Sequence, residues 1–288
     1  MYGFALILFT TYVLLDVFLI PRTYQTVEST KDNEIGASEE KQSSVVTDSS
    51  YEDDNMKINI KTYEEYDTQI YVADIVVSDA SYLKTALAND VYGKNITETT
   101  SNMAKEKEAI LAINGDYYGV HDDGYVIRNG VLYREEESSN DQEDLVIQED
   151  GSFQVITEGT VTANELILEG AMQVLSFGPQ LVTDGSVVVT EDEEVGRAKA
   201  SNPRTAIGIV DDLHYVMVVS DGRTEESEGL SLYQLATFLN DLGVDMAYNL
   251  DGGGSSTMYF NGSVVNNPTS NGGRIKERSV SDIVYIGY

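Results

Sequence analysis

Residues 249–257 hold the densest group of side chains able to do chemistry: one carboxylate, Asp251, followed by three glycines and three hydroxyl side chains. Successive glycines are unfavourable in a regular element, because glycine loses the most backbone entropy on folding. A chain keeps them where it needs positive φ or a close approach of another group. Backbone N–H groups freed in this way can form an anion-binding nest. The segment therefore predicts a catalytic carboxylate beside a cradle for a phosphate or a sugar oxygen, with a tight turn between strands as the alternative. The predicted cradle consists of Gly252, Gly253, Gly254 and Ser255.

Three further carboxylates lie in short polar segments and are candidates for the same chemistry. Glu277 is the second choice after Asp251, and Asp116 and Asp221 are reserves. Cleavage of a glycosidic bond commonly uses two carboxyl groups that flank it. Because Glu277 stands beside Arg278, the residues alone favour a surface ion pair of small energetic value over a catalytic role for it.

Three arginines stand out because the chain is strongly acidic, with 49 acidic and 18 basic residues and a net charge of −31. They are Arg204, Arg223 and Arg278. We expect them to form a local positive pocket, since a guanidinium binds phosphate through two parallel hydrogen bonds. Pairing with surface carboxylates is the alternative.

Sugar recognition has its own candidates. Asn114 carries both a donor and an acceptor, which suits sugar hydroxyls, although an Asn-Gly turn would also explain it. The chain has no Trp, so an aromatic platform for a sugar must be Tyr or Phe. Tyr117, Tyr118 and Tyr259 lie in or beside the polar segments, and a core or rim position is the alternative for each.

Together, the segments that carry these residues resemble, in order, those of the phosphodiester glycosidase family. They are residues 112–119, 177–182, 204–209, 220–223, 229–232, 249–257, 267–268 and 277–280. The resemblance covers residues 57–288 and implies hydrolysis of the bond between a sugar's anomeric carbon and a phosphodiester oxygen. Such a leaving group is already a stable anion, so it needs positive charge rather than an acid. The resemblance therefore assigns Arg204 and Arg278 to the phosphate, and Asp251 with Glu277 to the anomeric carbon.

The composition excludes several other kinds of site. The chain has no Cys and two His, which excludes zinc–thiolate sites, cysteine nucleophiles and His-rich metal sites. No cofactor is indicated, except that Asp122 and Asp123 are candidate oxygen ligands for a divalent cation such as Ca²⁺. Nucleic acid is not an expected partner, because its binding requires a basic surface.

The N-terminal stretch is apolar over residues 3–20 apart from Thr10, Thr11 and Asp16. At ~1.5 Å per residue, a helix here would be ~27 Å long, which is enough to cross a bilayer core. No basic residue precedes the stretch and no small-residue cleavage site follows it, which favours an uncleaved anchor over a signal peptide. Residues 1–22 are therefore predicted as a single-pass anchor in the cell membrane with the catalytic domain extracellular, and a buried core helix is the alternative.

The remaining chain divides into a linker and one domain. Residues 23–56 carry nine acidic and two basic residues and few apolar ones, a composition typical of a disordered linker. Over residues 57–288, strands outnumber helices without alternating strictly with them. This favours an α+β fold, a single mixed-sheet domain with short hairpins and a few packing helices. Apolar periodicity predicts strands over 57–61, 70–77, 109–113, 205–210, 214–219 and 282–286, and helices over 81–88, 100–108, 161–169 and 231–242. Ser231 is a candidate N-cap of the last helix. The Asn-Gly pair in residues 128–131 and the Asp-Gly pair in residues 149–152 predict hairpin turns.

The sequence thus predicts an exported hydrolase that cleaves a sugar-1-phosphodiester in a cell-envelope glycoconjugate or cell-wall polymer. A conventional glycoside hydrolase that uses the same carboxylates is the first alternative, and it predicts cleavage of a plain aryl glycoside. A non-catalytic glycan-binding module is the second, and it predicts binding that survives loss of Asp251 and Glu277.

Overall fold

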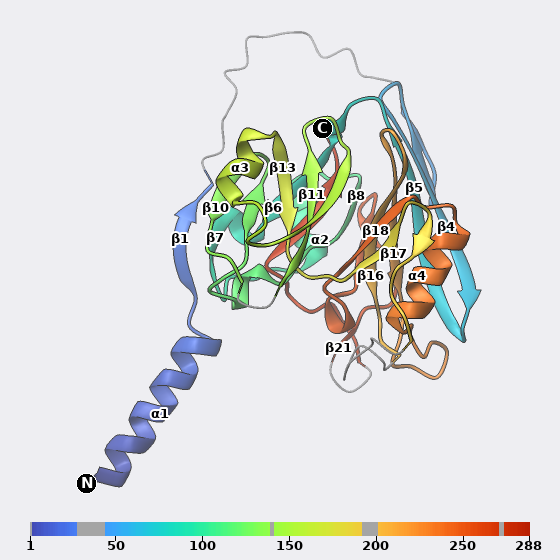
Figure 1. Cartoon of the computed structure of the whole chain (residues 1–288). Helices are drawn as coiled ribbons and strands as arrows, with labels where there is room; N and C mark the ends of the chain where they lie inside the picture. The colour runs from blue at the N-terminus through green and yellow to red at the C-terminus, as the bar shows by residue number, and fades with distance from the viewer. Residues whose placement is uncertain (1, 28–43, 139–140, 192–200, 271–273) are drawn as a thin grey trace, which may run out of the picture.

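The computed structural model describes residues 2–27, 44–138, 141–191, 201–270 and 274–288 (Figure 1). In these residues strands dominate, and the predicted α+β class is wrong: the domain is mostly β. The reason is that antiparallel sheets absorb most of the chain, while two of the helices have only 7 and 6 residues. The α-helices among the described residues are α1 (Tyr2–Phe18), α2 (Thr100–Glu106), α3 (Ala163–Leu168) and α4 (Leu232–Asp241). Short 3₁₀ helices are η1 (Ala80–Tyr82), η2 (Ala88–Asp90), η3 (Tyr118–Val120) and η5 (Gly253–Ser255).

The largest sheet has nine strands in the order β15-β14-β18-β16-β17-β5-β4-β3-β2, and all neighbours are antiparallel. In β5, Ile70 and Val72 face α4, whereas Ala73, Ile75 and Val77 face the central core. Because successive side chains of a strand point to opposite faces, a strand covered on both faces is apolar at nearly every position. The strands are β2 (Val45–Val46), β3 (Ser50–Glu52), β4 (Met56–Glu65), β5 (Thr68–Val77), β14 (Gln180–Thr183), β15 (Ser186–Val187), β16 (Thr205–Asp211), β17 (His214–Ser220) and β18 (Met246–Leu250).

Two five-stranded sheets complete the domain, in the orders β20-β19-β8-β23-β6 and β10-β9-β13-β11-β12. The first contains β6 (Leu83–Leu87), β8 (Leu111–Asn114), β19 (Met258–Phe260), β20 (Ser263–Val264) and β23 (Asp282–Ile286). The second contains β9 (Val126–Arg128), β10 (Val131–Arg134), β11 (Glu143–Gln148), β12 (Phe153–Thr157) and β13 (Ala171–Leu175). Two-stranded pairs join β1 (Arg22–Thr26) to β7 (Val91–Lys94) and β21 (Thr269–Ser270) to β22 (Arg274–Ile275).

The three large sheets share one central core. Ile207 and Leu250 of the nine-stranded sheet pack there with Ile113 and Val284 of the first five-stranded sheet and Leu145 of the second. Each sheet carries one helix against its opposite face: α4 on the nine-stranded sheet, α2 on the sheet of β8, and α3 on the sheet of β11. In Figure 1, α3 and α4 accordingly lie on opposite flanks of the domain.

Helix α4 confirms the prediction over residues 231–242. Ser231 and Gln234 form a reciprocal capping box at its start, and Gly243 follows its end with φ +81°. The helix predicted over residues 81–88 is wrong, because Leu83–Leu87 forms β6 and pairs with β23. Helix-favouring residues give way there to backbone pairing inside a large sheet, since tertiary context overrides intrinsic propensity.

The predicted membrane anchor over residues 1–22 is also wrong. Helix α1 spans 17 residues, and among the described residues no helix is both long and apolar enough to cross a membrane. Pro21 limits the extension of α1 at its C-terminal end, because the residue before a proline is disfavoured in the helical conformation. The same finding overturns the predicted single-pass location in the cell membrane, and it removes the support for an extracellular catalytic domain and a membrane partner.

The predicted linker over residues 23–56 contains paired strands. β1 pairs with β7, and β2 and β3 extend the nine-stranded sheet beyond β4. Residues 28–43 of the predicted linker lie outside the described residues.

Candidate active site

Strand ends from two sheets meet at one edge of the domain and bring the polar segments together. Asp251 directly follows β18, whose last residue pairs with Thr205 at the start of β16. Asn114 ends β8 in the neighbouring sheet. Its Nδ2 donates to the backbone carbonyl of Asp251 at 2.6 Å, and its Oδ1 accepts from the Thr205 hydroxyl at 2.8 Å. Asn114, predicted to bind substrate, therefore joins the two sheets behind Asp251.

Asp251 is the carboxylate best placed for chemistry. Its Oδ2 accepts from Arg278 Nη2 at 2.7 Å and from the Ser255 hydroxyl at 2.5 Å. Burial raises the pKa of Asp251 above its ordinary value, and the Arg278 guanidinium opposes that rise. The Asp251 side chain is only 10% exposed, whereas the Arg278 side chain is 44% exposed. An anion arriving from solvent can therefore reach the arginine that pairs with the buried carboxylate.

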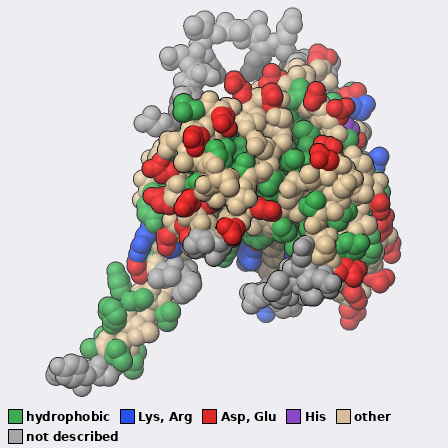
Figure 2. Space-filling view, viewed as in Figure 1, with side chains coloured by type: hydrophobic (Ala, Val, Ile, Leu, Met, Phe, Trp, Pro, Cys, Tyr) green, Lys and Arg blue, Asp and Glu red, His purple; other side chains and the backbone are tan. Residues whose placement is uncertain are grey.

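Each glycine of the segment has a different arginine among its nearest neighbours, although the Pro203 carbonyl is nearer to Gly252 than Arg204 is. At Gly253 an added Cβ would lie 2.9 Å from Arg223 Nη2, and φ is +63°, a conformation that favours glycine. The three pairs are Gly252 with Arg204, Gly253 with Arg223, and Gly254 with Arg278. The structure thus gathers all three predicted arginines around one loop, although acidic side chains are spread over the face seen in Figure 2. A positive cluster in such a surface attracts anions to one place.

The backbone N–H groups of this loop are largely committed within the protein. The N–H of Gly253 donates to the Pro203 carbonyl at 2.8 Å, and those of Ser255 and Ser256 donate to loop carbonyls at 3.3 Å. The arginines, rather than the predicted backbone cradle, therefore supply the positive charge. Arg223 is exposed and donates to Asn202 at 2.8 Å.

Arg204 differs from the other two arginines because it is buried. Its Nε donates to the Leu230 carbonyl at 2.8 Å, and its backbone N–H donates to the Ser220 hydroxyl at 2.9 Å. Arg223 and Arg278 are therefore the accessible members of the cluster.

Replacing Gly253 with alanine should displace Arg223 and weaken anion binding. We expect a loss of about 1–2 kcal/mol in unfolding free energy from the left-handed backbone, and weaker binding of inorganic phosphate from the displaced guanidinium. Urea unfolding and phosphate titration measure the two effects. Gly185→Ala is the matched control, because Gly185 has φ +62° and nothing within 4 Å of an added Cβ. Equal phosphate affinity in both variants would contradict the assignment of Arg223 to the anion site.

Two predicted catalytic carboxylates are engaged elsewhere. Both oxygens of Glu277 accept from Ser101 in the first turn of α2, from its N–H at 3.0 Å and its hydroxyl at 2.7 Å. A carboxylate at this position stabilises a helix N-terminus. Asp221 is buried and accepts from Tyr71, Asn266 and Asn267. We therefore assign structural roles to Glu277 and Asp221.

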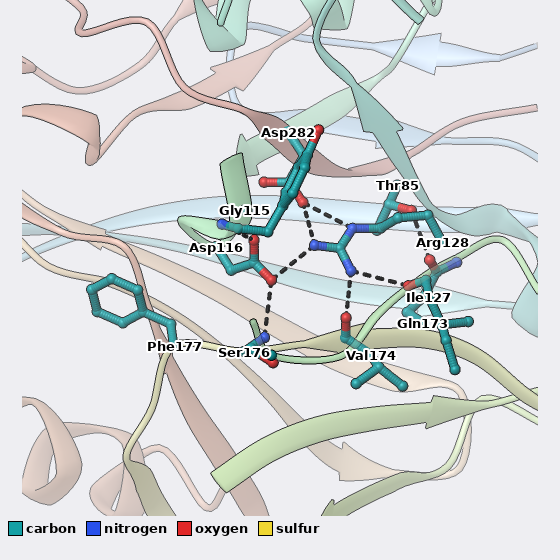
Figure 3. A network of polar contacts seen from close by, with 12 residues as sticks. Thr85, Gly115, Asp116, Ile127, Arg128, Gln173, Val174, Ser176, Phe177 and Asp282 are labelled. Atoms are coloured by element: carbon teal, nitrogen blue, oxygen red, sulfur yellow. Dashed lines mark hydrogen bonds and ion pairs between the residues drawn. The ribbon is translucent and has the colours of Figure 1, made fainter. Parts of the chain in front are cut away.

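Asp116 belongs to a buried ion-pair network centred on Arg128 (Figure 3). Arg128 Nη2 donates to Asp116 at 2.8 Å and to Asp282 at 2.7 Å, and all three side chains are buried. The two Asp116 oxygens also accept backbone N–H groups of Tyr118 and Ser176, each at 2.9 Å. Asp116 therefore fixes the turn after β8. Burial and the neighbouring Asp116 raise the pKa of Asp282, and Arg128 opposes this rise.

A metal site finds no support in the described residues, where no group of three or more His, Asp or Glu side chains is placed to hold an ion. Asp122, one of the two predicted Ca²⁺ ligands, pairs with Lys94 Nζ at 2.6 Å.

Comparison with known proteins places these residues in a family. Residues 107–287 match the model of the phosphodiester glycosidase family. The uncharacterized SPbeta prophage-derived protein YomE of Bacillus subtilis is 32% identical over 201 residues, covering 68% of this chain and 31% of that protein. Human N-acetylglucosamine-1-phosphodiester alpha-N-acetylglucosaminidase is 27% identical over 190 residues, covering 59% of this chain and 36% of that protein. The chain thus spans about a third of the length of the curated relatives it matches.

A solved structure has the same fold. The zebrafish N-acetylglucosamine-1-phosphodiester alpha-N-acetylglucosaminidase catalytic domain, auto-inhibited by its pro-peptide, aligns with a TM-score of 0.64 at 22% identity. The alignment covers 81% of this chain and 83% of that one. A crystallised hypothetical protein from Synechocystis aligns with a TM-score of 0.54 at 16% identity, covering 81% of this chain and 62% of the other.

Proposed function

Because the chain belongs to the phosphodiester glycosidase family, we propose that it hydrolyses the bond between the anomeric carbon of a sugar and an oxygen of a phosphodiester. Water supplies the hydroxyl that ends on the anomeric carbon, and the phosphomonoester leaves as an anion. The observation that carries the proposal is the Asp251–Arg278 pair, in which a buried carboxylate adjoins an exposed guanidinium. A cell-envelope glycoconjugate as the natural substrate stays a prediction.

Arg278 suits the phosphate side of the scissile bond, and Asp251 suits the sugar side. Negative charge grows on the phosphate as the bond breaks, and a preorganised guanidinium stabilises it. Positive charge grows on the sugar in an oxocarbenium-like transition state, which a neighbouring carboxylate stabilises, or the carboxylate accepts a proton from the attacking water. Arg223 adds a second exposed cation, which lies against Gly253 next to the Gly254 that Arg278 contacts.

The full chain should release reducing sugar from sugar-1-phosphodiesters. We would incubate it with UDP-N-acetylglucosamine and both anomers of methyl-phosphate diesters of N-acetylglucosamine, glucose and mannose, beside aryl glycosides of the same sugars. The full chain is required, because β1, β2 and β3 precede residue 57 and pair with the domain. Faster release from aryl glycosides than from phosphodiesters would favour a conventional glycoside hydrolase, and binding of these sugars without any turnover would favour a glycan-binding module.

Replacing Arg278 with glutamine should further distinguish a phosphodiester glycosidase from a conventional glycoside hydrolase. We expect kcat/KM for a phosphodiester to fall about 10²- to 10³-fold, the effect of removing one group that stabilises developing negative charge. Activity on an aryl glycoside should change far less. Since Arg278 lowers the pKa of Asp251, its loss should also move the acidic limb of the pH–rate profile to higher pH. Arg278→Lys is the matched control that retains the charge but not the planar fork. Equal losses on both substrates would contradict a role on the phosphate.

A further inference from the structure

Tyr117 differs from the other two tyrosines of the polar segments in its exposure. Tyr118 and Tyr259 are buried in hydrophobic clusters, whereas Tyr117 is 39% exposed and lies outside the clusters formed by the described residues. The turn that carries it is held rigidly, because Asp116 accepts the N–H of Tyr118 at 2.9 Å and is itself bound to buried Arg128. An exposed aromatic side chain on a fixed turn needs an explanation other than core packing.

The neighbours of the Tyr117 ring place it at the reaction centre. The Arg278 guanidinium lies over one face of the ring, with its carbon 6.0 Å from the ring centroid, and the same guanidinium contacts Asp251 at 2.7 Å. The His121 ring stands nearly perpendicular to Tyr117, with 5.9 Å between centroids and an interplanar angle of 78°. Arg278 is therefore a neighbour of both Tyr117 and Asp251, and the edge-on contact with His121 supports the Tyr117 ring.

Arg223 lies against the neighbouring glycine of the same loop. It lies against Gly253, whereas Arg278 lies against Gly254 and Tyr117. The two exposed arginines thus differ in their surroundings, since Arg278 has an aromatic ring beside it and Arg223 lies against the adjacent glycine. A substrate made of an anion and a sugar has a matching difference between its two ends.

We infer that Tyr117 is the platform for the sugar ring, so that the sugar packs against Tyr117 and the phosphodiester extends over Arg278 toward Arg223. The inference rests on the proposed function for the order of the two substrate halves. The C–H groups of a pyranose form an apolar face that packs on an aromatic ring, and tyrosine combines such a surface with a polar hydroxyl. Ligand pockets are commonly built from aromatic walls and a few placed polar groups. In a chain without Trp, tyrosine is the amphipathic aromatic residue available for this role.

The test measures binding of the sugar and binding of the phosphate separately. The full chain and its Tyr117→Ala, Tyr117→Phe and Tyr117→Trp variants would be titrated with methyl N-acetylglucosaminide and methyl glucoside, and independently with inorganic phosphate. We expect Tyr117→Ala to weaken sugar binding about tenfold and to leave phosphate binding unchanged, while Phe and Trp preserve both. Tyr12→Ala is the control, because Tyr12 is an exposed tyrosine on α1, which projects away from the domain (Figures 1 and 2). With a phosphodiester that turns over, Tyr117→Ala should raise KM and leave kcat within about threefold.

Sugar binding tests the role of Tyr117 independently of whether the chain hydrolyses a phosphodiester. If the unmodified chain binds the sugar and Tyr117→Ala does not, the platform stands even when no donor is hydrolysed. Equal sugar binding in Tyr117→Ala and the unmodified chain, or no sugar binding by either, would overturn it. Loss of sugar and phosphate binding together would also overturn it, since Tyr117 would then be holding the loop rather than the sugar.

Discussion

Replacement of Asp251 by asparagine should lower kcat by about 10²- to 10⁴-fold, the usual contribution of a positioned acid–base group. Asparagine keeps the size of the side chain and retains an oxygen that can accept from Ser255, so the loop should stay folded. Arg278 loses its anionic partner at 2.7 Å and becomes freer to bind phosphate. KM should therefore stay level or fall, and the loss should appear in kcat. Initial rates over a range of phosphodiester concentrations measure both quantities.

The pH dependence of the unmodified enzyme gives a second test of Asp251. Because burial raises its pKa, the carboxylate ionises at higher pH than an ordinary Asp. If the ionised form acts, the rate rises along an acidic limb that lies above the usual Asp range, and this limb disappears in Asp251→Asn. Glu277→Gln is the matched control, because Glu277 bonds Ser101 of α2 instead. A large kcat loss in Glu277→Gln with normal stability would show that the second carboxylate acts in catalysis after all.

The sequence predicted correctly those elements that are determined by neighbouring residues, such as tight turns and helix ends. The Asn129–Gly130 hairpin has positive φ at both residues, as the Asn-Gly turn requires. Helix α4 begins at a capping box that the sequence displays. Residues 83–87 carry no such local signal, because their strand state comes from pairing with β23 about 200 residues later. The mostly β class followed from many such long-range pairings.

Local signals also account for the part of the candidate site that the sequence predicted. Asp251, the glycines and the arginines were predicted because each lies in a recognisable polar segment, and the fold brings these segments together. Arg128 was missed because it appears in the sequence as an ordinary hairpin arginine, with partners 12 and 154 residues away. Its importance comes from complete burial, which sequence spacing does not report.

Replacing Arg128 with methionine should cost about 3–5 kcal/mol of unfolding free energy, because it leaves two buried carboxylates without their cation. Arg128 also donates to the Ile127 and Val174 carbonyls, so the substitution removes bonds to three separate segments. The turn from Asp116 to Tyr118 should loosen with it. Urea unfolding of the full chain measures the stability, and sugar binding measures the effect on Tyr117.

Further variants separate the effect of unpaired buried charge in Arg128→Met from the effect of lost packing. If uncompensated charge causes the loss, adding Asp116→Asn and Asp282→Asn to Arg128→Met should restore part of the stability, since neutral groups are cheaper to bury than unpaired carboxylates. If the arginine contributes only volume, the triple variant should be no more stable than Arg128→Met. Asp282→Asn alone is the milder variant if Arg128→Met fails to fold, and it should be less destabilising because Arg128 keeps Asp116 as its anion. An unfolding free energy for Arg128→Met within about 1 kcal/mol of the unmodified chain would contradict the buried ion pair as a stabilising unit.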